Sequence, residues 1–433
     1  MTAETIDMIR SYQIKQPIII MIILMMSFSF TILSGCEKSI IYHNDGFLKS
    51  TKNENETEGN YVMIPQGSDQ TEHMEIKRLK LEGFSIIDKI GKYYYGYYSI
   101  ETENGLDSKY QLIEENGSTK DIQYPKGVED WTVASGDYVI MSEQYLYEWL
   151  CYTESTDSAF YEARLLKLDI QTGIVSVVEE RKMSSPFVYM SKFDDTSFIF
   201  YTVSKAQSYS GKAEYATLTT AYIYNTQNDT YHEIISEIYE YDGSWENSTG
   251  VLIERFDCLN GHIYGIGRIA TDNKFCFFLY EYDSIGRFIS KKCLQGLAEI
   301  VGEEQFLEIH LVGDYLLFRT YETLSNYICL LEKEKVSVVC KGLYGQAQYG
   351  ITSSNIYFIE SNVDMNTAIP SIKYNPVYKI DIAKKTAKKC NYKIDISKPY
   401  FYEIKSTNDN KIIISYCKDG EYNPCKIVNY LVL

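Results

Sequence analysis

Short runs of apolar and aromatic residues, each opened by a turn residue, recur along most of the chain. A corner of Gly, Asp, Ser or Asn is followed by a run rich in Tyr, Phe, Ile and Val, which is the pattern of a β-strand. The segment Asn260–Cys293 reads as turn, strand, loop, strand, short turn and third strand. Seven such corners occur, at residues 91, 136, 195, 261, 313, 354 and 409.

Three further strands complete each unit. A hairpin follows the first strand, most clearly at Leu165–Val178, where LKLD and IVSVV flank a QTG turn. A weaker strand precedes each corner, as at Leu307–Val312 and Tyr400–Ser406. A period of about 40–50 residues with four short strands is typical of propeller blades. The sequence therefore predicts an all-β β-propeller with seven four-stranded blades. Six or eight blades remain open because the first unit is weak.

The last unit lacks a fourth strand, because its third strand, Lys426–Leu433, ends the sequence. The strand-like segment His73–Leu81 precedes the first unit and has no unit of its own. We expect it to complete the last blade and to close the ring, which removes an open sheet edge. The alternative is that it belongs to the preceding tether.

The N-terminus has the features of a secretory signal. Arg10 and Lys15 precede a mostly apolar run, Pro17–Leu33, which ends in Leu33-Ser34-Gly35-Cys36. This ending resembles the bacterial lipoprotein signal, and the resemblance implies cleavage before Cys36 and lipidation of Cys36. The predicted organisation is a signal peptide over 1–35, a lipidated cysteine with a disordered tether over 36–72, and a propeller over 73–433. An uncleaved membrane anchor is the alternative. Both place the propeller outside the cytoplasm, and the first anchors it by lipid to the cell membrane.

The net charge limits the classes of ligand, and the cysteines bear on possible disulfides. The chain has 42 Lys and Arg against 59 Asp and Glu, a net charge of −17, which argues against nucleic acid and against an anionic polymer or membrane surface as ligand. Nine cysteines follow Cys36. Buried thiols are favoured for them over disulfides, although Cys417 with Cys425 and Cys329 with Cys340 could face each other.

Long insertions are expected on one rim of the ring, over blades two to four. They are Glu143–Glu162, Ser204–Thr217 and Ser236–Gly250. Loops on a rigid scaffold are frequent binding sites, and exposed Tyr and Trp are frequent contact residues. The predicted ligand-binding residues of this rim are Tyr145, Tyr147, Trp149, Tyr152, Tyr239, Tyr241 and Trp245. The alternative is that these aromatic side chains pack down and hold the loops.

Motifs for catalysis or metal binding are not evident. The five histidines are scattered without ligand spacing, and no Gly-x-Ser-x-Gly or phosphate-binding glycine loop occurs. The sequence therefore predicts no catalytic residue, no metal site and no cofactor.

The repeat resembles the Tyr-rich propeller repeats of uncharacterised exported lipoproteins of low-GC Gram-positive bacteria. The residues that carry this resemblance are Asn260-GHIYGI, Asn355-IYFIES, Leu165-LKLDIQTG and Val377-YKIDIAKKT. It implies a propeller on the cell surface, without assigned chemistry.

Three functions are compatible with these patterns. The first is a membrane-anchored, non-catalytic binding module for a protein or glycan, with its ligand on the rim of blades two to four. The second is a secreted polysaccharide hydrolase or lyase with acids in the central funnel. The third is a structural component of an envelope complex. Fold class does not separate them, and the oligomeric state is open.

Overall fold

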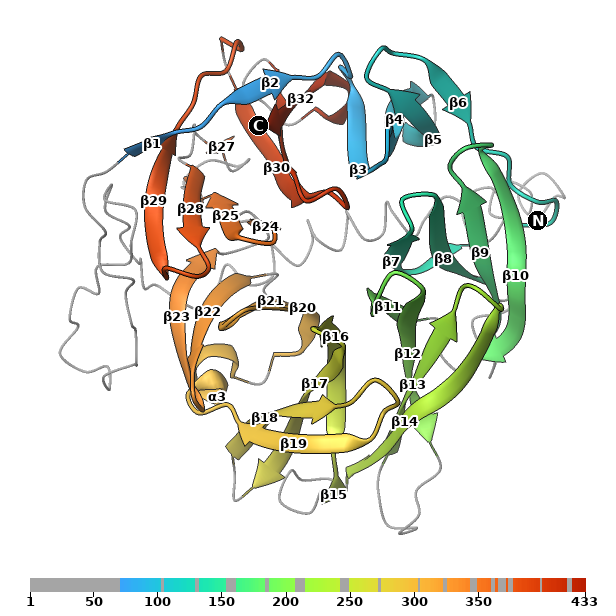
Figure 1. The fold of residues 1–433 in the computed structure, drawn as a ribbon, viewed down its shortest axis with the longest axis vertical. Coiled ribbons are helices and arrows are strands. Elements are labelled where there is room, and N and C mark those ends of the chain that lie inside the picture. Colours follow the sequence, from blue (N-terminus) through green and yellow to red (C-terminus); the bar gives the residue numbers. More distant parts are fainter. Residues whose placement is uncertain are drawn as a thin grey trace, which may run out of the picture.

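Seven β-sheets stand around a central axis as the blades of a propeller (Figure 1). The computed structural model describes residues 71–102, 105–128, 132–152, 161–183, 187–206, 215–241, 249–271, 274–302, 304–321, 325–342, 349–359, 363–364, 371–372, 377–397, 399–418 and 423–433. The all-β fold and the number of blades are therefore confirmed. In each blade the strands step outward from the axis in chain order, except that in the last two blades the outermost strand comes from the N-terminal side.

The first three blades follow one another along the chain. Blade 1 contains β3 (Phe84–Ile90), β4 (Tyr93–Thr102), β5 (Gly105–Glu114) and β6 (Thr119–Asp121). Blade 2 contains β7 (Thr132–Met141), β8 (Tyr145–Tyr152), β9 (Tyr161–Asp169) and β10 (Ile174–Met183). Blade 3 contains β11 (Val188–Lys192), β12 (Ser197–Ala206), β13 (Tyr215–Asn225), β14 (Thr230–Tyr241) and the short β15 (Thr249–Gly250).

Blades 4 and 5 are joined by a short helix, α3 (Leu297–Val301). Blade 4 contains β16 (Leu252–Leu259), β17 (His262–Thr271), β18 (Lys274–Tyr282) and β19 (Phe288–Cys293). Blade 5 contains β20 (Phe306–Val312), β21 (Tyr315–Thr320), β22 (Asn326–Glu332) and β23 (Lys335–Gly342).

The last two blades include strands from the N-terminal side. Blade 6 contains β24 (Tyr349–Ile351), β25 (Asn355–Ile359), β28 (Val377–Asp381), β29 (Thr386–Asn391) and β1 (Thr71–His73). A two-stranded hairpin, β26 (Val363–Asp364) and β27 (Ser371–Ile372), is inserted between β25 and β28. Blade 7 contains β30 (Tyr400–Ser406), β31 (Ile412–Cys417), β32 (Ile427–Val432) and β2 (Ile76–Arg78), with a 3-10 turn, η1 (Pro424–Lys426), before β32.

The predicted closure of the ring is confirmed. Strand β2 pairs antiparallel with β32, so that Ile76 lies opposite Val432 and Arg78 lies opposite Tyr430. The N-terminal segment thus supplies the outer strand that the C-terminal unit lacks. One detail differs from the prediction. Strand β1, just before β2, pairs in parallel with β29, so the segment seals two blades instead of one.

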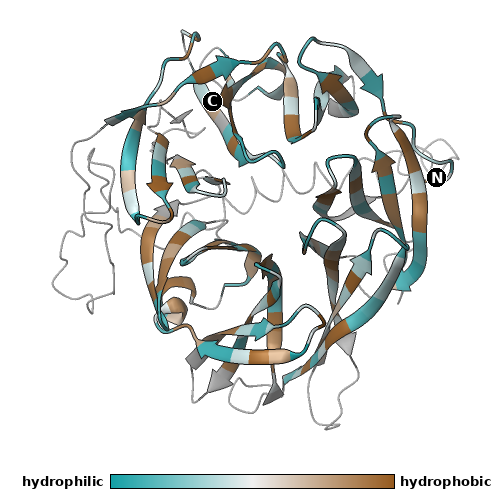
Figure 2. Ribbon diagram, in the orientation of Figure 1, coloured by the Kyte–Doolittle hydropathy of each residue, from teal (hydrophilic) through white to brown (hydrophobic). Residues whose placement is uncertain are grey.

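The core lies between the blades. Brown apolar bands occur in the strands of every blade (Figure 2), because successive side chains point to opposite faces of a sheet and both faces pack against neighbouring blades. The contact of blade 2 with blade 3 is strongly aromatic. The ring centroid of Trp149 lies 5.3 Å from that of Phe200, and that of Tyr147 lies 5.2 Å from that of Phe198. Such pairs are each worth about 0.5–1.5 kcal/mol beyond their buried area.

The predicted corner at residue 136 is wrong. Gly136 lies inside β7, where the ladder with β8 jumps from Val133 opposite Leu150 to Tyr138 opposite Glu148. The Ser-Gly pair there marks a bulge, and bulges use the same small residues as turns. The real corner follows at Ser142 and Glu143, which both have positive φ angles, of 54° and 50°. Ser142 fits the corner pattern, but Glu143 does not, and the Ser-Gly pair a few residues earlier gave the stronger turn signal.

Residues 1–70, with the predicted signal, Cys36 and the tether, lie outside the described residues. In the part of the chain that is described, no helix has the length and apolar character needed to cross a membrane. The nine cysteines after Cys36 are thiols, not disulfides, in this structure, and Cys340 lies opposite Ile328 instead of opposite Cys329.

Candidate functional site in the axial pocket

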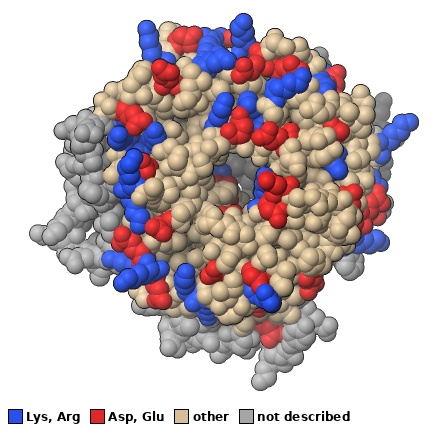
Figure 3. Space-filling view, in the orientation of Figure 1, with Lys and Arg blue, Asp and Glu red and all other residues tan. Residues whose placement is uncertain are grey.

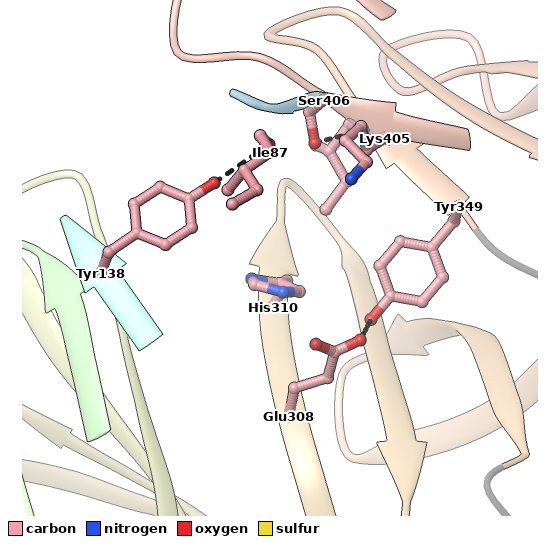
Figure 4. A pocket seen from close by; sticks show the side chains of 8 residues that line it. Ile87, Tyr138, Glu308, His310, Tyr349, Lys405 and Ser406 are labelled. Atoms are coloured by element: carbon pink, nitrogen blue, oxygen red, sulfur yellow. Dashed lines mark hydrogen bonds between the residues drawn. The ribbon is translucent and has the colours of Figure 1, made fainter. Parts of the chain in front are cut away.

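A cavity of about 510 Å³ lies where the innermost strands of five blades meet (Figures 3 and 4). These strands are β3, β7, β20, β24 and β30, so the cavity lies at the middle of the ring, where Figure 3 shows a hollow bordered by acidic and basic side chains. Its lining consists of Ile87, Tyr138, Glu308, His310, Tyr349, Ile351, Lys405 and Ser406. Small-molecule sites in proteins have volumes of roughly 300–1,000 Å³. We call this cavity the axial pocket.

Bulges set the direction of the polar side chains. In β20 the ladder skips one residue between Phe306 and Glu308, and in β30 it skips one between Phe401 and Glu403. An extra residue bends the strand and redirects the side chains that follow it. After the bulge in β20, Glu308 and His310 are two residues apart and point to the same side, toward the pocket.

The polar side chains of the pocket contact one another. The Tyr349 hydroxyl donates a hydrogen bond to Oε1 of Glu308 at 3.1 Å, and the ring of His310 lies edge-on to that of Tyr349 with centroids 6.1 Å apart (Figure 4). Burial and the neighbouring Glu308 raise the pKa of Tyr349 well above its usual value, so its hydroxyl remains a donor. Nζ of Lys405 lies 2.9 Å from Oε2 of Glu403. The pocket thus presents a carboxylate, an ammonium group, an imidazole and phenols.

Other acids near the axis hold neighbouring blades together. Asp88 in blade 1 accepts a hydrogen bond from the backbone N–H of Asn408 in blade 7, at 2.8 Å, and one from the Tyr138 hydroxyl in blade 2, at 3.1 Å. Asp137 accepts from the N–H of Met190 at 3.3 Å, which joins blades 2 and 3. These carboxylates are therefore engaged in the scaffold, whereas Glu308 faces the axial pocket.

Acidification will stabilise the ring because the protein shields these two carboxyls, Asp88 and Asp137, from water. Burial raises the pKa of Asp88 and that of Asp137 to about 6 each. The folded state therefore binds their protons more tightly than the unfolded chain does, and the free energy of unfolding should increase as the pH falls from about 7 to about 5. Each group contributes on the order of 1 kcal/mol over this window. Acids whose pKa values are lowered by ion pairs, such as Glu72, lose their contribution at lower pH.

Urea unfolding at several pH values measures this effect. Asp137→Asn should flatten the dependence between about pH 7 and about pH 5, while the exposed control Asp195→Asn should not. A slope that is unchanged in Asp137→Asn would exclude Asp137 as its source.

The predicted rim in blade 2 is wrong. Tyr145–Tyr152 forms strand β8 instead of a loop, and Tyr147 and Trp149 are fully buried against blade 3. Their loop assignment followed from the misplaced corner at residue 136. Tyr145 and Tyr152 lie at the two ends of β8 and are half-buried. These aromatic residues serve the core, as the packing alternative expected.

Of the remaining predicted rim residues, two lie in β14 and one lies outside the described residues. Tyr239 is buried in β14, which extends to Tyr241. Trp245 lies outside the described residues. None of the predicted rim residues lines the axial pocket.

The pocket residues Glu308, His310 and Lys405 were not singled out by the sequence. They lie in the weak strands Leu307–Val312 and Tyr400–Ser406, which were predicted as strands but not as sites. The available signal was the polar residues that interrupt apolar strands, as in FLEIHLV. Within the described residues, no group of three His, Cys, Asp or Glu side chains is placed to hold a metal ion.

Exposed apolar side chains occur at the outer edge of blade 4. Ile285, Phe288 and Ile289 are 55%, 59% and 47% exposed, in β19 and the turn before it. An apolar patch on a blade side is what the structural hypothesis predicts.

Comparison with known proteins found similar folds among solved structures, but no related sequence. No family model matches the sequence, and no curated protein matches it. Among solved structures, the chain is similar to polysaccharide lyase Uly1, with 10% identity over 89% of this chain and 94% of that chain and a TM-score of 0.43. It is also similar to the β-propeller domain of the Trilobed protease from Pyrococcus furiosus (10% identity, 70% and 81% covered, TM-score 0.38). For the Pyrococcus horikoshii acylaminoacyl peptidase the identity is 11% and the TM-score 0.42, and the alignment covers 80% of this chain and about half, 49%, of that chain.

Proposed function

We propose that this chain is an extracytoplasmic, lipid-anchored β-propeller that binds a neutral, polyhydroxylated ligand, such as part of a cell-envelope glycan, in the axial pocket. Export and lipidation are supported by the charged start, the apolar run Pro17–Leu33 and Cys36. The observation that carries the binding proposal is the axial pocket itself. The proposal moves the ligand from the rim, where the sequence placed it, to the axis.

The composition of the axial pocket supports a sugar-like ligand. The carboxylate of Glu308 supplies acceptors and the ammonium group of Lys405 supplies donors in one space, and Glu403 offsets the charge of Lys405. A strongly anionic ligand would meet Glu308, and a cationic one would meet Lys405. Tyr138 and Tyr349 add flat aromatic rings against which a sugar ring can lie. A polyhydroxylated ligand uses all of these groups together.

Removal of single polar groups from the pocket should weaken binding. Lys405→Met keeps the length of the side chain but loses three donors, and His310→Ala removes the imidazole. Each should weaken the affinity for a glycan identified by array screening by at least about tenfold, since hydrogen bonds to charged groups are worth about 1.5–3 kcal/mol. Isothermal titration calorimetry on the full-length protein measures this affinity.

The matched control is Lys384→Met, which removes a 76% exposed lysine from a turn of blade 6, far along the blade from the inner strand. Its affinity should equal that of the unmodified protein. If Lys405→Met and His310→Ala both bind like Lys384→Met, the axial site is refuted.

A second function is favoured by one observation, the contact of Tyr349 with Glu308 beside His310. Phenol, carboxylate and imidazole are the groups that general acid–base catalysis uses. A polysaccharide lyase in the funnel would use groups of this kind, whereas a hydrolase of the common type would need a second carboxyl group beside Glu308. Incubation with the bound glycan separates the two functions. New reducing ends, or the ultraviolet absorbance of unsaturated sugars, would indicate hydrolysis or elimination, and intact glycan would indicate binding alone.

A further inference from the structure

A buried carboxylate occupies an apolar position between blades 1 and 2. Along β8, Leu146, Glu148 and Leu150 point to the same face, toward blade 1. Leu146 and Leu150 belong to the apolar cluster of this interface and are 1% and 5% exposed. Glu148 lies between them and is only 9% exposed. A carboxylate at such a place is costly unless a partner offsets its charge.

Tyrosines cover this carboxylate from blade 1. Tyr93, Tyr95 and Tyr97 alternate along β4, and Tyr110 of β5 lies opposite Tyr97. The ring centroid of Tyr110 lies 5.3 Å from that of Tyr97 and 6.2 Å from that of Tyr95. The rings lead from the interior to the surface, because Tyr95 is 4% exposed and Tyr110 is 38% exposed.

The connection between blades 1 and 2 adds a further ring. Tyr124 is 42% exposed, and its side chain is hydrogen-bonded to that of Tyr95. The neighbours of Glu148 on the same face, Leu146 and Leu150, pack in one cluster with Tyr95, which places the carboxyl group beside blade 1. Burial, and to a lesser extent the charge of Glu148, raise the pKa values of Tyr95, Tyr110 and Tyr124. Tyr138, opposite Glu148 in the ladder, directs its hydroxyl to Ile87 and Asp88 instead.

Tyrosine rings of this protein attract cations elsewhere. Nζ of Lys120 lies 4.8 Å from the ring centroid of Tyr93, the next rung of the same series, and Nζ of Lys167 lies 4.2 Å from that of Tyr145. Among the described residues, no lysine or arginine lies over the rings of Tyr97 and Tyr110 or forms an ion pair with Glu148. The exposed side of this group is formed by Tyr110 and Tyr124, which are 38% and 42% exposed, so a cation would approach the carboxylate past these two rings.

We propose that Glu148, Tyr95, Tyr97, Tyr110 and Tyr124 form a binding site for an organic ammonium ion. The carboxylate would offset the charge of the ligand, and the faces of the rings would attract its polarised methyl or methylene groups. The site is separate from the axial pocket, because Glu148 lies on the second strand of blade 2 and none of the five residues lines that pocket. Its test therefore does not depend on the glycan proposal.

Choline is a suitable probe, and 3,3-dimethyl-1-butanol is its neutral isostere. Calorimetric titration of the full-length protein at about pH 8 keeps the carboxyl ionised. We expect choline to bind at least about tenfold more tightly than the isostere, and Glu148→Gln to lose at least about tenfold in choline affinity. Tyr110→Leu, which changes a partly exposed residue, should also weaken the binding of choline. The control Glu143→Gln, in the exposed turn before β8, should leave the affinity unchanged.

Acidification should weaken the binding of choline as well. Burial raises the pKa of Glu148 to about 7, so the carboxyl is protonated in acid and loses the charge that attracts the ligand. An affinity for choline that is equal at about pH 8 and at about pH 5.5 would contradict the site. So would the absence of choline binding at millimolar concentrations, or an equal affinity for the neutral isostere.

Stability distinguishes a ligand-binding carboxylate from a structural one. Glu148→Leu continues the apolar face of Leu146 and Leu150, so without ligand its melting temperature should be higher than that of the unmodified protein. A lower melting temperature would show that the carboxylate stabilises the interface, and it would overturn the proposal.

Discussion

Asn429→Ala will lower the free energy of unfolding by about 3–5 kcal/mol, because it leaves several buried polar groups without partners. Nδ2 of Asn429 donates to the carbonyl oxygens of Leu81 and Phe84 at 2.9 and 2.8 Å, and Oδ1 accepts from the Ser415 hydroxyl at 2.7 Å. Asn429 is completely buried. It links the C-terminal strand β32 to the segment that leads from the closing strand β2 into blade 1.

Urea unfolding measures the loss, and Asn391→Ala is the control, since Asn391 is an exposed asparagine at the end of β29. The control should change the free energy of unfolding by less than about 0.5 kcal/mol. A cost for Asn429→Ala as small as that of the control would mean that the junction of the two chain ends contributes little to the stability of the ring.

Arg268→Met will have a comparably large effect in blade 4. Nε of Arg268 lies 2.6 Å from Oε1 of Glu254, and the two side chains are 4% and 6% exposed. Oε2 of Glu254 accepts from the backbone N–H of Phe306 in blade 5 at 3.0 Å. Removal of the guanidinium leaves a buried charge without its counter-ion, which costs about 3–5 kcal/mol.

The double variant Glu254→Gln with Arg268→Met separates the ion pair from the packing. A neutral glutamine still offers an oxygen to Phe306, so the double variant should unfold at a higher urea concentration than Arg268→Met alone. If the double variant is less stable than the single one by the full cost of a second, independent substitution, the two side chains do not act as a pair.

Local chemistry made the blades predictable. Asn260 and Gly261 have positive φ angles of 53° and 77°, the geometry that Asn-Gly favours in tight hairpins, and strands β16 and β17 meet there as expected. The closing strand was predictable for another reason. A C-terminal unit with three strands leaves an edge, and His73–Leu81 was an unassigned strand-like segment that could cover it.

Blade 2 shows where the same chemistry misleads. A Ser-Gly pair at a bulge has the same composition as a corner and therefore predicts one. The true corner is formed by Ser142 and Glu143, which both have positive φ angles, and a glutamate rarely adopts that conformation. An error of a few residues turned the strand β8 into a loop. It also turned Trp149, a core residue, into a candidate for ligand binding.

The axial pocket was harder to predict because its residues meet only when the ring closes. Tyr138, Glu308 and Lys405 belong to blades 2, 5 and 7, and nothing in their local sequence relates them to one another. Polar residues inside the innermost strands were visible. Whether such a side chain holds a neighbouring blade, as Asp88 does, or faces the axial pocket, as Glu308 does, depends on where bulges redirect the strand.

The most direct test of the binding proposal is to fill the axial pocket. Ile351→Trp places a large side chain into a cavity of about 510 Å³ from the innermost strand of blade 6. Binding to an array of cell-envelope glycans would be compared with that of the unmodified full-length protein, and circular dichroism would show that the variant is folded. We predict that the folded variant loses the glycan that the unmodified protein binds. Undiminished binding by the folded variant would contradict an axial site.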